Sequence, residues 1–113
     1  MGVNVACQAI SDYDTAMVRT TQDILDTLKD QKVALFEKYP IRRISLFGSW
    51  SRGEQRQNSD VDILVDVDPA IGLGFVSLAD ELEHMLGHKV DLVSRRAIRT
   101  SLWKQIEPDL IDA

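Results

Sequence analysis

The feature that most constrains this chain is a polar stretch, residues 48–62, with the sequence GSWSRGEQRQNSDVD. It separates two short apolar runs, residues 44–47 and residues 61–67. Both runs are rich in β-branched or aromatic residues, and this composition is typical of strands. We therefore expect the polar stretch to be a loop between two strands.

Gly48 and Ser49 open this loop and have the composition of a phosphate-binding turn. Glycine lets a ligand approach the backbone closely, and the Ser49 hydroxyl and the N–H groups of a helix starting there would point at an anion. A Gly-Ser pair is more often an ordinary turn with a helix cap. The interpretation as a phosphate site therefore depends on the acidic residues that follow.

Asp60 and Asp62 lie two residues apart at the start of the second apolar run. Because side chains alternate along a strand, both carboxylates leave the same face, ~7 Å apart, and can converge on one divalent ion. The alternative is a solvated acidic face on an edge strand, which suits Asp66 and Asp68 better. Asp is depleted in strands, and neighbouring like charges repel unless a cation lies between them, so the first pair favours a metal site.

A third carboxylate, Asp91, lies in the apolar run 89–93, which also has the composition of a strand. If this run pairs beside residues 61–67, the strand spacing of about 5 Å brings Asp91 into the same cluster. Three acidic residues on two adjacent strands can hold two metal ions about 3.5–4 Å apart. The sequence therefore predicts a two-metal site.

These motifs resemble the signature of the DNA polymerase β nucleotidyltransferase superfamily, specifically its short, stand-alone minimal nucleotidyltransferase branch. That signature runs Gly-Ser, ten residues, Asp-x-Asp, and ten residues separate Ser49 from Asp60 here. Arg52 lies inside the spacer, and Asp91 matches the third acidic residue of the family. The resemblance implies one α/β (α+β) domain, with a small mixed sheet of three to four strands flanked by helices. In the family a further strand often follows the last helix.

The chemistry that the resemblance implies is nucleotidyl transfer, in which an acceptor hydroxyl attacks the α-phosphate of a nucleoside triphosphate and pyrophosphate leaves. Two Mg²⁺ ions are expected. The residues expected to act in catalysis and to bind the metal are Asp60, Asp62 and Asp91. The residues expected to bind the nucleotide are Gly48, Ser49 and Arg52. The arrangement is not a P-loop, because Glu54 and Gln55 stand where that motif needs Lys and then Ser or Thr.

The expected acceptor also comes from the resemblance. Short stand-alone members are typically antitoxins encoded beside an α-helical HEPN ribonuclease, which they silence by moving AMP from ATP to a tyrosine of the toxin. The same role, with ATP as substrate and a HEPN toxin as partner, is the leading hypothesis here. The alternatives are a nucleotidyltransferase with a small-molecule or nucleic-acid acceptor, and a non-catalytic antitoxin that neutralises by binding. Because all three acidic residues are present, catalysis is favoured.

Composition limits the other possibilities. With 113 residues the chain is expected to be one domain, residues 1–113, and its net charge of −5 argues against broad nucleic-acid binding. No apolar run approaches the ~20 residues of a membrane span. A signal peptide begins with basic residues, and none precedes Arg19 here. The single cysteine, Cys7, cannot form an internal disulfide. We therefore expect a cytoplasmic protein.

Hydrophobic periodicity predicts the remaining elements. Helices are expected over residues 20–39, 49–55, 75–86 and 97–106, and a flexible or helical arm over 1–18. Trp50 either packs against the turn or is an exposed anchor for a partner. His84 and His88 are interpreted as solvated or capping groups, because Gly87 ends the helix between them. A basic group is either a solvated helix face or a contact for phosphate or an acidic partner: Arg95, Arg96, Arg99 and Lys104.

Overall fold

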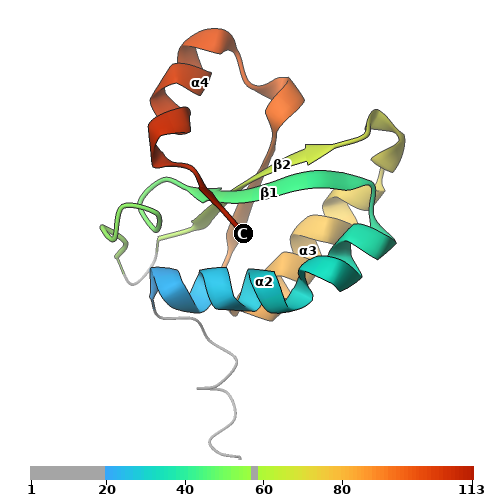
Figure 1. Ribbon diagram of the computed structural model, residues 1–113, viewed down its shortest axis with the longest axis horizontal. Coiled ribbons are helices and arrows are strands. Elements are labelled where there is room, and N and C mark those ends of the chain that lie inside the picture. Colours follow the sequence, from blue (N-terminus) through green and yellow to red (C-terminus); the bar gives the residue numbers. More distant parts are fainter. Residues whose placement is uncertain (1–19, 57–58) are drawn as a thin grey trace, which may run out of the picture.

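The computed structural model describes residues 20–56 and 59–113, so the arm expected over residues 1–18 lies outside the described part. Two helices, α2 (Thr21–Lys38) and α3 (Gly74–Leu86), lie on one face of a central sheet, and a shorter helix, α4 (Thr100–Ile106), lies on the other (Figure 1). The fold is therefore α+β, with the sheet as its middle layer.

The sheet has four strands in the order β3-β2-β1-β4. β1 (Ile41–Phe47) pairs antiparallel with β2 (Val61–Val67) and with the two-residue β4 (Ile111–Asp112). β3 (Val90–Ser94) pairs parallel with the other edge of β2. The sheet is therefore mixed, as expected. β4 lies in the short tail after the last helix, where the sequence alone did not predict a strand.

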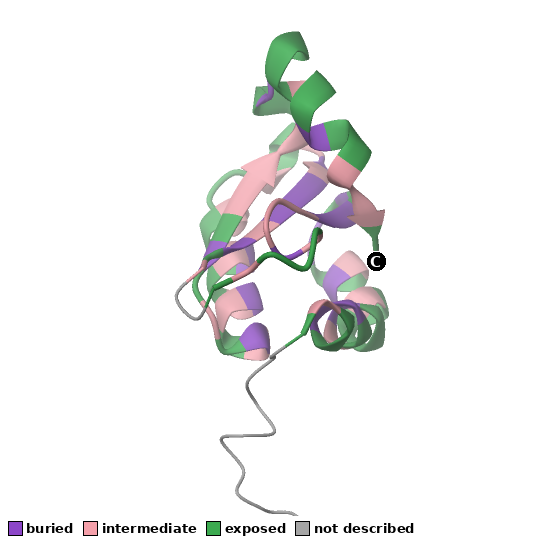
Figure 2. Cartoon of the chain, turned by 90° about the vertical axis from the view of Figure 1, so that its left-hand side faces the viewer, coloured by how far each residue is buried: buried purple, intermediate pink, exposed green. Residues whose placement is uncertain are grey.

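The alternation predicted along β2 is confirmed and separates two apolar clusters. Val61, Ile63, Val65 and Val67 are buried in the larger cluster, against α2 and α3. Leu64 faces the opposite way and packs with Ile98 and Ile106 in a smaller cluster beside α4. Figure 2 colours the buried residues of the strands and helices purple. Asp62 shares the face of Leu64, because it is two residues away along the strand.

The helix ends follow local chemistry. α2 begins at a capping box, in which Asp23 N–H donates to Thr20 Oγ1 at 3.0 Å and Thr20 N–H donates to Asp23 Oδ2 at 3.1 Å. α3 ends at Gly87, which has the left-handed conformation (φ 67°) expected of it. In the described part of the chain, no helix combines the length and the apolar character needed to cross a membrane.

The last helix begins later than predicted. The sequence indicated a helix from residue 97, but residues Arg95–Ala97 form a short 3-10 turn, η2, and Ile98 is extended (φ −89°, ψ 127°). Ile98 is buried in the smaller cluster, so burial of this side chain outweighs the helical preference of its neighbours. α4 therefore starts at Thr100 and has only seven residues.

Candidate active site

Gly48, at the end of β1, lies directly against the carboxylate of Asp62. Its φ of 78° is left-handed, a conformation that favours glycine. A Cβ placed on Gly48 would overlap Asp62 Oδ2 and lie 3.0 Å from Asp62 Cγ. Both the backbone conformation and the available space therefore require glycine here. The start of the predicted phosphate turn is next to Asp62, which is half-buried.

The turn after Gly48 is held by its own backbone. The Gly48 carbonyl accepts hydrogen bonds from Ser51 N–H at 3.1 Å, Arg52 N–H at 3.2 Å and the Ser51 hydroxyl at 2.9 Å. The Ser49 carbonyl accepts from Glu54 N–H at 2.9 Å. The short helix predicted over residues 49–55 is wrong. The segment forms consecutive turns instead, and Gly53, with a left-handed φ of 70°, ends them.

The Ser49 hydroxyl, expected to contact phosphate, has no hydrogen-bond partner among residues 20–56 and 59–113. Its residue is half-buried at the beginning of the turn. The position is compatible with the predicted role, which stays a prediction.

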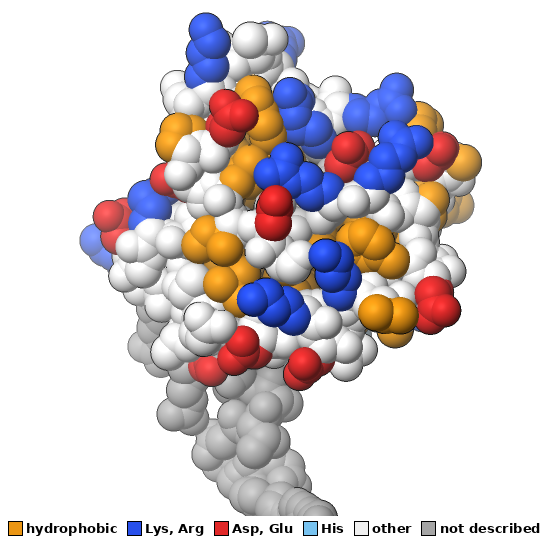
Figure 3. Space-filling model, in the orientation of Figure 1, with side chains coloured by type: hydrophobic (Ala, Val, Ile, Leu, Met, Phe, Trp, Pro, Cys, Tyr) orange, Lys and Arg blue, Asp and Glu red, His pale blue; other side chains and the backbone are white. Residues whose placement is uncertain are grey.

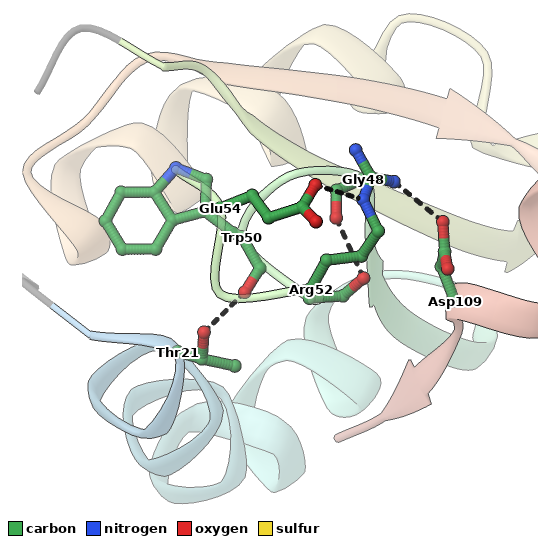
Figure 4. Close-up of polar contacts among 7 residues, drawn as sticks. Thr21, Gly48, Trp50, Arg52, Glu54 and Asp109 are labelled. Carbon is green, nitrogen blue, oxygen red and sulfur yellow. Dashed lines mark hydrogen bonds and ion pairs between the residues drawn. The ribbon is translucent and has the colours of Figure 1, made fainter. Parts of the chain in front are cut away.

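Trp50 packs beneath the turn and is only 2% exposed, so its interpretation as an exposed anchor is wrong. Its indole N–H donates to the Ser59 carbonyl at 3.4 Å, and its ring meets the His88 ring edge-on with centroids 5.1 Å apart. The Thr21 hydroxyl, at the start of α2, donates to the Trp50 carbonyl (Figure 4). Because Ser59 immediately precedes Asp60, Trp50 connects the two ends of the loop.

The predicted acidic residues lie on adjacent strands. Asp62 of β2 is directly in register with Asp91 of β3, which confirms the pairing that the cluster required. Asp60 comes immediately before β2 and is exposed, as is Asp91, whereas Asp62 is half-buried. Burial raises the pKa of Asp62 to about 6, and the charges of Asp91 and Asp60 add to this rise while Arg52 opposes it. Asp91, Asp60 and Arg52 therefore all lie close enough to Asp62 to act on its charge.

The predicted metal site is supported by chemistry more than by side-chain placement. Within residues 20–56 and 59–113, no three His, Cys, Asp or Glu side chains are grouped closely enough to hold a metal ion. The donors nevertheless suit Mg²⁺, which prefers carboxylate oxygens, and their mutual repulsion at Asp62 is what a cation would relieve. Metal binding by Asp60, Asp62 and Asp91 stays a prediction.

Arg52 is held by two carboxylates that the sequence did not bring to attention. Its Nε donates to Glu54 Oε1 at 2.9 Å, and its Nη1 donates to Asp109 Oδ2 at 2.8 Å (Figure 4). These hydrogen bonds, first Glu54 and then Asp109, raise the pKa of Arg52 above its ordinary value. Asp109 is 57 residues away along the chain, in the 3-10 turn η3 (Glu107–Asp109), and no spacing or motif pointed to it.

His84 lies in the last turn of α3, and His88 follows the Gly87 that ends this helix. His84 is exposed, with Nδ1 2.9 Å from the Asp80 carbonyl oxygen, which agrees with a solvated position near a helix end. His88 is half-buried and its ring packs on Trp50. A shallow depression of about 380 Å³ is lined by Glu83, His84, Gly87, His88 and Lys89.

The basic group over η2 and α4 remains at the surface. Arg95 stacks on the Trp103 ring with its guanidinium carbon 3.8 Å from the ring centroid. The other members of the basic group are exposed: Arg96, Arg99 and Lys104. On the face shown in Figure 3, Lys and Arg side chains are interspersed with Asp and Glu, so this face presents no continuous basic field of the kind that nucleic-acid binding uses.

The arrangement of strands and motifs defines a nucleotidyltransferase. A glycine-serine turn ends one strand, an Asp-x-Asp pair begins its antiparallel neighbour, and a third Asp lies in register on the next strand. The model of the family described as "Nucleotidyltransferase domain" matches residues 26–112. The chain therefore belongs to the nucleotidyltransferase domain family, in the branch of minimal nucleotidyltransferases that includes the protein adenylyltransferases.

Three relatives show the similarity. The protein adenylyltransferase MntA of Thermococcus cleftensis is 37% identical over 94 residues, covering 81% of this chain and 94% of MntA. A crystal structure of a toxin–antitoxin with AMP-PNP superimposes with a TM-score of 0.60 and 32% identity, covering 83% of this chain and 72% of that chain. The structure of a tri-AMPylated Shewanella oneidensis HEPN toxin in complex with an MNT antitoxin gives a TM-score of 0.57 and 29% identity, covering 82% of this chain and 71% of that chain.

Proposed function

We propose that this chain transfers AMP from ATP to a tyrosine hydroxyl of an α-helical HEPN ribonuclease toxin and silences the toxin by this modification. The observation that carries the proposal is the contact of Gly48 with the Asp62 carboxylate, with Asp91 in register beside it. This contact joins a phosphate-binding turn to paired acids. The relatives support the choice of nucleotide and acceptor, because one structure contains AMP-PNP and another contains an AMPylated HEPN toxin.

The turn and Arg52 are assigned to the phosphates. Gly48 leaves the backbone open to the β- and γ-phosphates, and the Ser49 hydroxyl is available to donate to a phosphate oxygen. Arg52 adds a fixed positive charge close enough to Asp62 to lower its pKa. Such positioning and charge stabilisation supply most of the catalysis in phosphoryl-group chemistry.

The three carboxylates are assigned to metal binding and proton transfer. When bound by Asp60, Asp62 and Asp91, Mg²⁺ supplies neutralisation of the triphosphate and of the departing pyrophosphate. Asp91 is exposed on the same sheet face, where it can orient the acceptor hydroxyl and accept its proton. The acceptor oxygen forms a bond to the α-phosphorus, the bond from the α-phosphorus to the bridging oxygen breaks, and pyrophosphate carries away the electron pair.

The test is the intact mass of the HEPN partner after incubation with this protein, Mg²⁺ and each nucleoside triphosphate in turn. We expect the partner to gain AMP units with ATP, and the gain to vanish in the Asp60→Asn, Asp62→Asn double variant. Asp66→Asn is the matched control, because Asp66 lies on the same strand but opposite Arg43. A tight complex that silences the toxin without any adduct would refute the enzymatic proposal and establish neutralisation by binding.

A further inference from the structure

Arg52 is held from two separate parts of the chain. Glu54 approaches its Nε from within the same turn, and Asp109 approaches its Nη1 from the C-terminal segment. Asp109 is the less exposed of the two carboxylates, with 26% of its side chain accessible against 65% for Glu54. Asp109 is therefore the better placed of the two to fix the guanidinium.

The backbone on each side of this contact is itself fixed. Arg52 N–H donates to the Gly48 carbonyl, so the base of the side chain is bound to the turn. After Asp109, Leu110 packs into the smaller apolar cluster and Ile111 pairs with Leu46 of β1. The contact therefore joins two rigid parts of the molecule, the turn and the sheet edge.

We propose that Asp109 is a positioning residue, which orients the Arg52 guanidinium so that its remaining N–H groups face the triphosphate. This inference rests on the proposed function. It adds a residue from outside the signature motif to the nucleotide site.

The donor count of arginine supports this role. A planar guanidinium carries five N–H donors, and fixing Nε and Nη1 fixes the plane of the whole group. Glu54 and Asp109 each take one donor, and Nη2 has no partner within the described residues, so its donors remain for a phosphate. Figure 4 shows the third nitrogen turned away from both carboxylates.

The same contact has a rival interpretation that the test must separate. A carboxylate beside a triphosphate site repels the ligand and competes for the arginine, so Asp109 could weaken nucleotide binding. Positioning predicts that loss of Asp109 weakens binding, because a freed arginine must be ordered again when the ligand binds. Competition predicts the opposite sign.

The experiment measures the dissociation constant of AMP-PNP with Mg²⁺ for four proteins: wild type, Asp109→Ala, Arg52→Gln and the double variant. We expect Asp109→Ala to raise the constant by about 2- to 10-fold, the cost of ordering one long side chain. In the Arg52→Gln background the same substitution is expected to have no further effect, because Asp109 acts through Arg52. Asp109→Asn is measured alongside and is expected to weaken binding less, because an amide oxygen can still accept from Nη1.

The matched control is Asp112→Asn. Asp112 belongs to the same C-terminal segment and makes an ion pair of the same length, 2.8 Å, with Arg43 instead of Arg52. We expect its variant to bind AMP-PNP as the wild type does, so a change confined to Asp109 cannot come from loosening of the segment.

Three results would overturn the proposal: unchanged or tighter binding by Asp109→Ala, an equal effect with and without Arg52, or no AMP-PNP binding by the wild type. A wild-type protein that binds AMP-PNP but leaves the HEPN partner unmodified would refute the proposed acceptor alone. The positioning role would still be decided by the binding constants.

Discussion

Replacing Asp62 by Asn should abolish transfer and at the same time stabilise the metal-free protein. Burial and the charges of Asp91 and Asp60 raise the pKa of Asp62 from 3.8 to about 6. An acid with a raised pKa prefers to be neutral in the folded state, so its ionisation costs folding free energy. The amide of Asn removes the charge with little change in size.

The size of this stabilisation follows from the shift in the pKa of Asp62. About two pKa units correspond to at most ~3 kcal/mol, since one unit is worth about 1.4 kcal/mol. Asp62 is only half-buried, and solvent screening reduces the effect to about 1 kcal/mol. For a domain of this size that is an increase of about 4 °C in Tm.

The pH dependence of stability provides an independent check on the direction of this effect. The pKa of Asp62 is higher in the folded state than in the unfolded state. The folding free energy lost by ionising Asp62 is therefore absent below about pH 4, grows between pH 4 and 6, and is complete above pH 6. We therefore expect Asp62→Asn and wild type to be equally stable near pH 4. The variant should be more stable by about 1 kcal/mol at pH 7.5.

The assay is urea unfolding in EDTA at both pH values, with Asp66→Asn as the control on the same strand. Addition of Mg²⁺ at pH 7.5 should then stabilise wild type and leave Asp62→Asn unchanged. A variant less stable than wild type at pH 7.5, or a difference that does not depend on pH, would show that ionising Asp62 does not carry the folding cost that we infer.

Three further predictions concern the structure around the site. Gly48→Ala should abolish transfer, because its Cβ overlaps the Asp62 carboxylate. The control Gly53→Ala has a similar φ of 70° and no atom within 4 Å of its Cβ, so it should only lose stability in urea. Equal loss of activity in both variants would assign the effect to backbone strain alone. Trp50→Ala should lower the free energy of unfolding by about 3–5 kcal/mol, the usual loss for a buried aromatic residue. Trp103 is half-buried, so Trp103→Ala should lower this free energy by less. Similar losses in the two variants would contradict the packing role of Trp50. Ser45→Ala should cost about 1 kcal/mol in urea unfolding, because the buried Ser45 hydroxyl donates to Asp112; no change in stability would show that this bond contributes nothing.

The parts of the site that are local in sequence could be predicted, and the parts made by distant contacts could not. Period-two alternation fixed the faces of β2, so the common face of Asp62 and Leu64 followed from sequence alone. The position of Asp91 needed one assumption, that its strand lies beside β2, and the register confirms it. Asp109 escaped prediction because only the packing of Leu110 and the pairing of β4 bring it to Arg52.

The two errors have different causes. Residues 49–55 have the composition of a helix start, but Gly53 adopts a left-handed φ of 70° and the Ser49 carbonyl accepts from Glu54 N–H, which ends the turns before a helix can extend. Trp50 could not be assigned from its neighbours, because its contacts include α2, His88 and the far end of the loop. Long-range packing therefore decided the position of Trp50, whereas the missing helix has a local cause.

The contact between Gly48 and Asp62 also limits how this chain could evolve. Any side chain at position 48 needs the space that the Asp62 carboxylate occupies, so a lineage that loses the glycine is under pressure to shorten residue 62 as well. Each of these changes removes a group assigned to the reaction, and restoring only one of them does not restore the reaction. A descendant that had lost both groups would therefore need two reversions to regain the chemistry, although it could keep the fold.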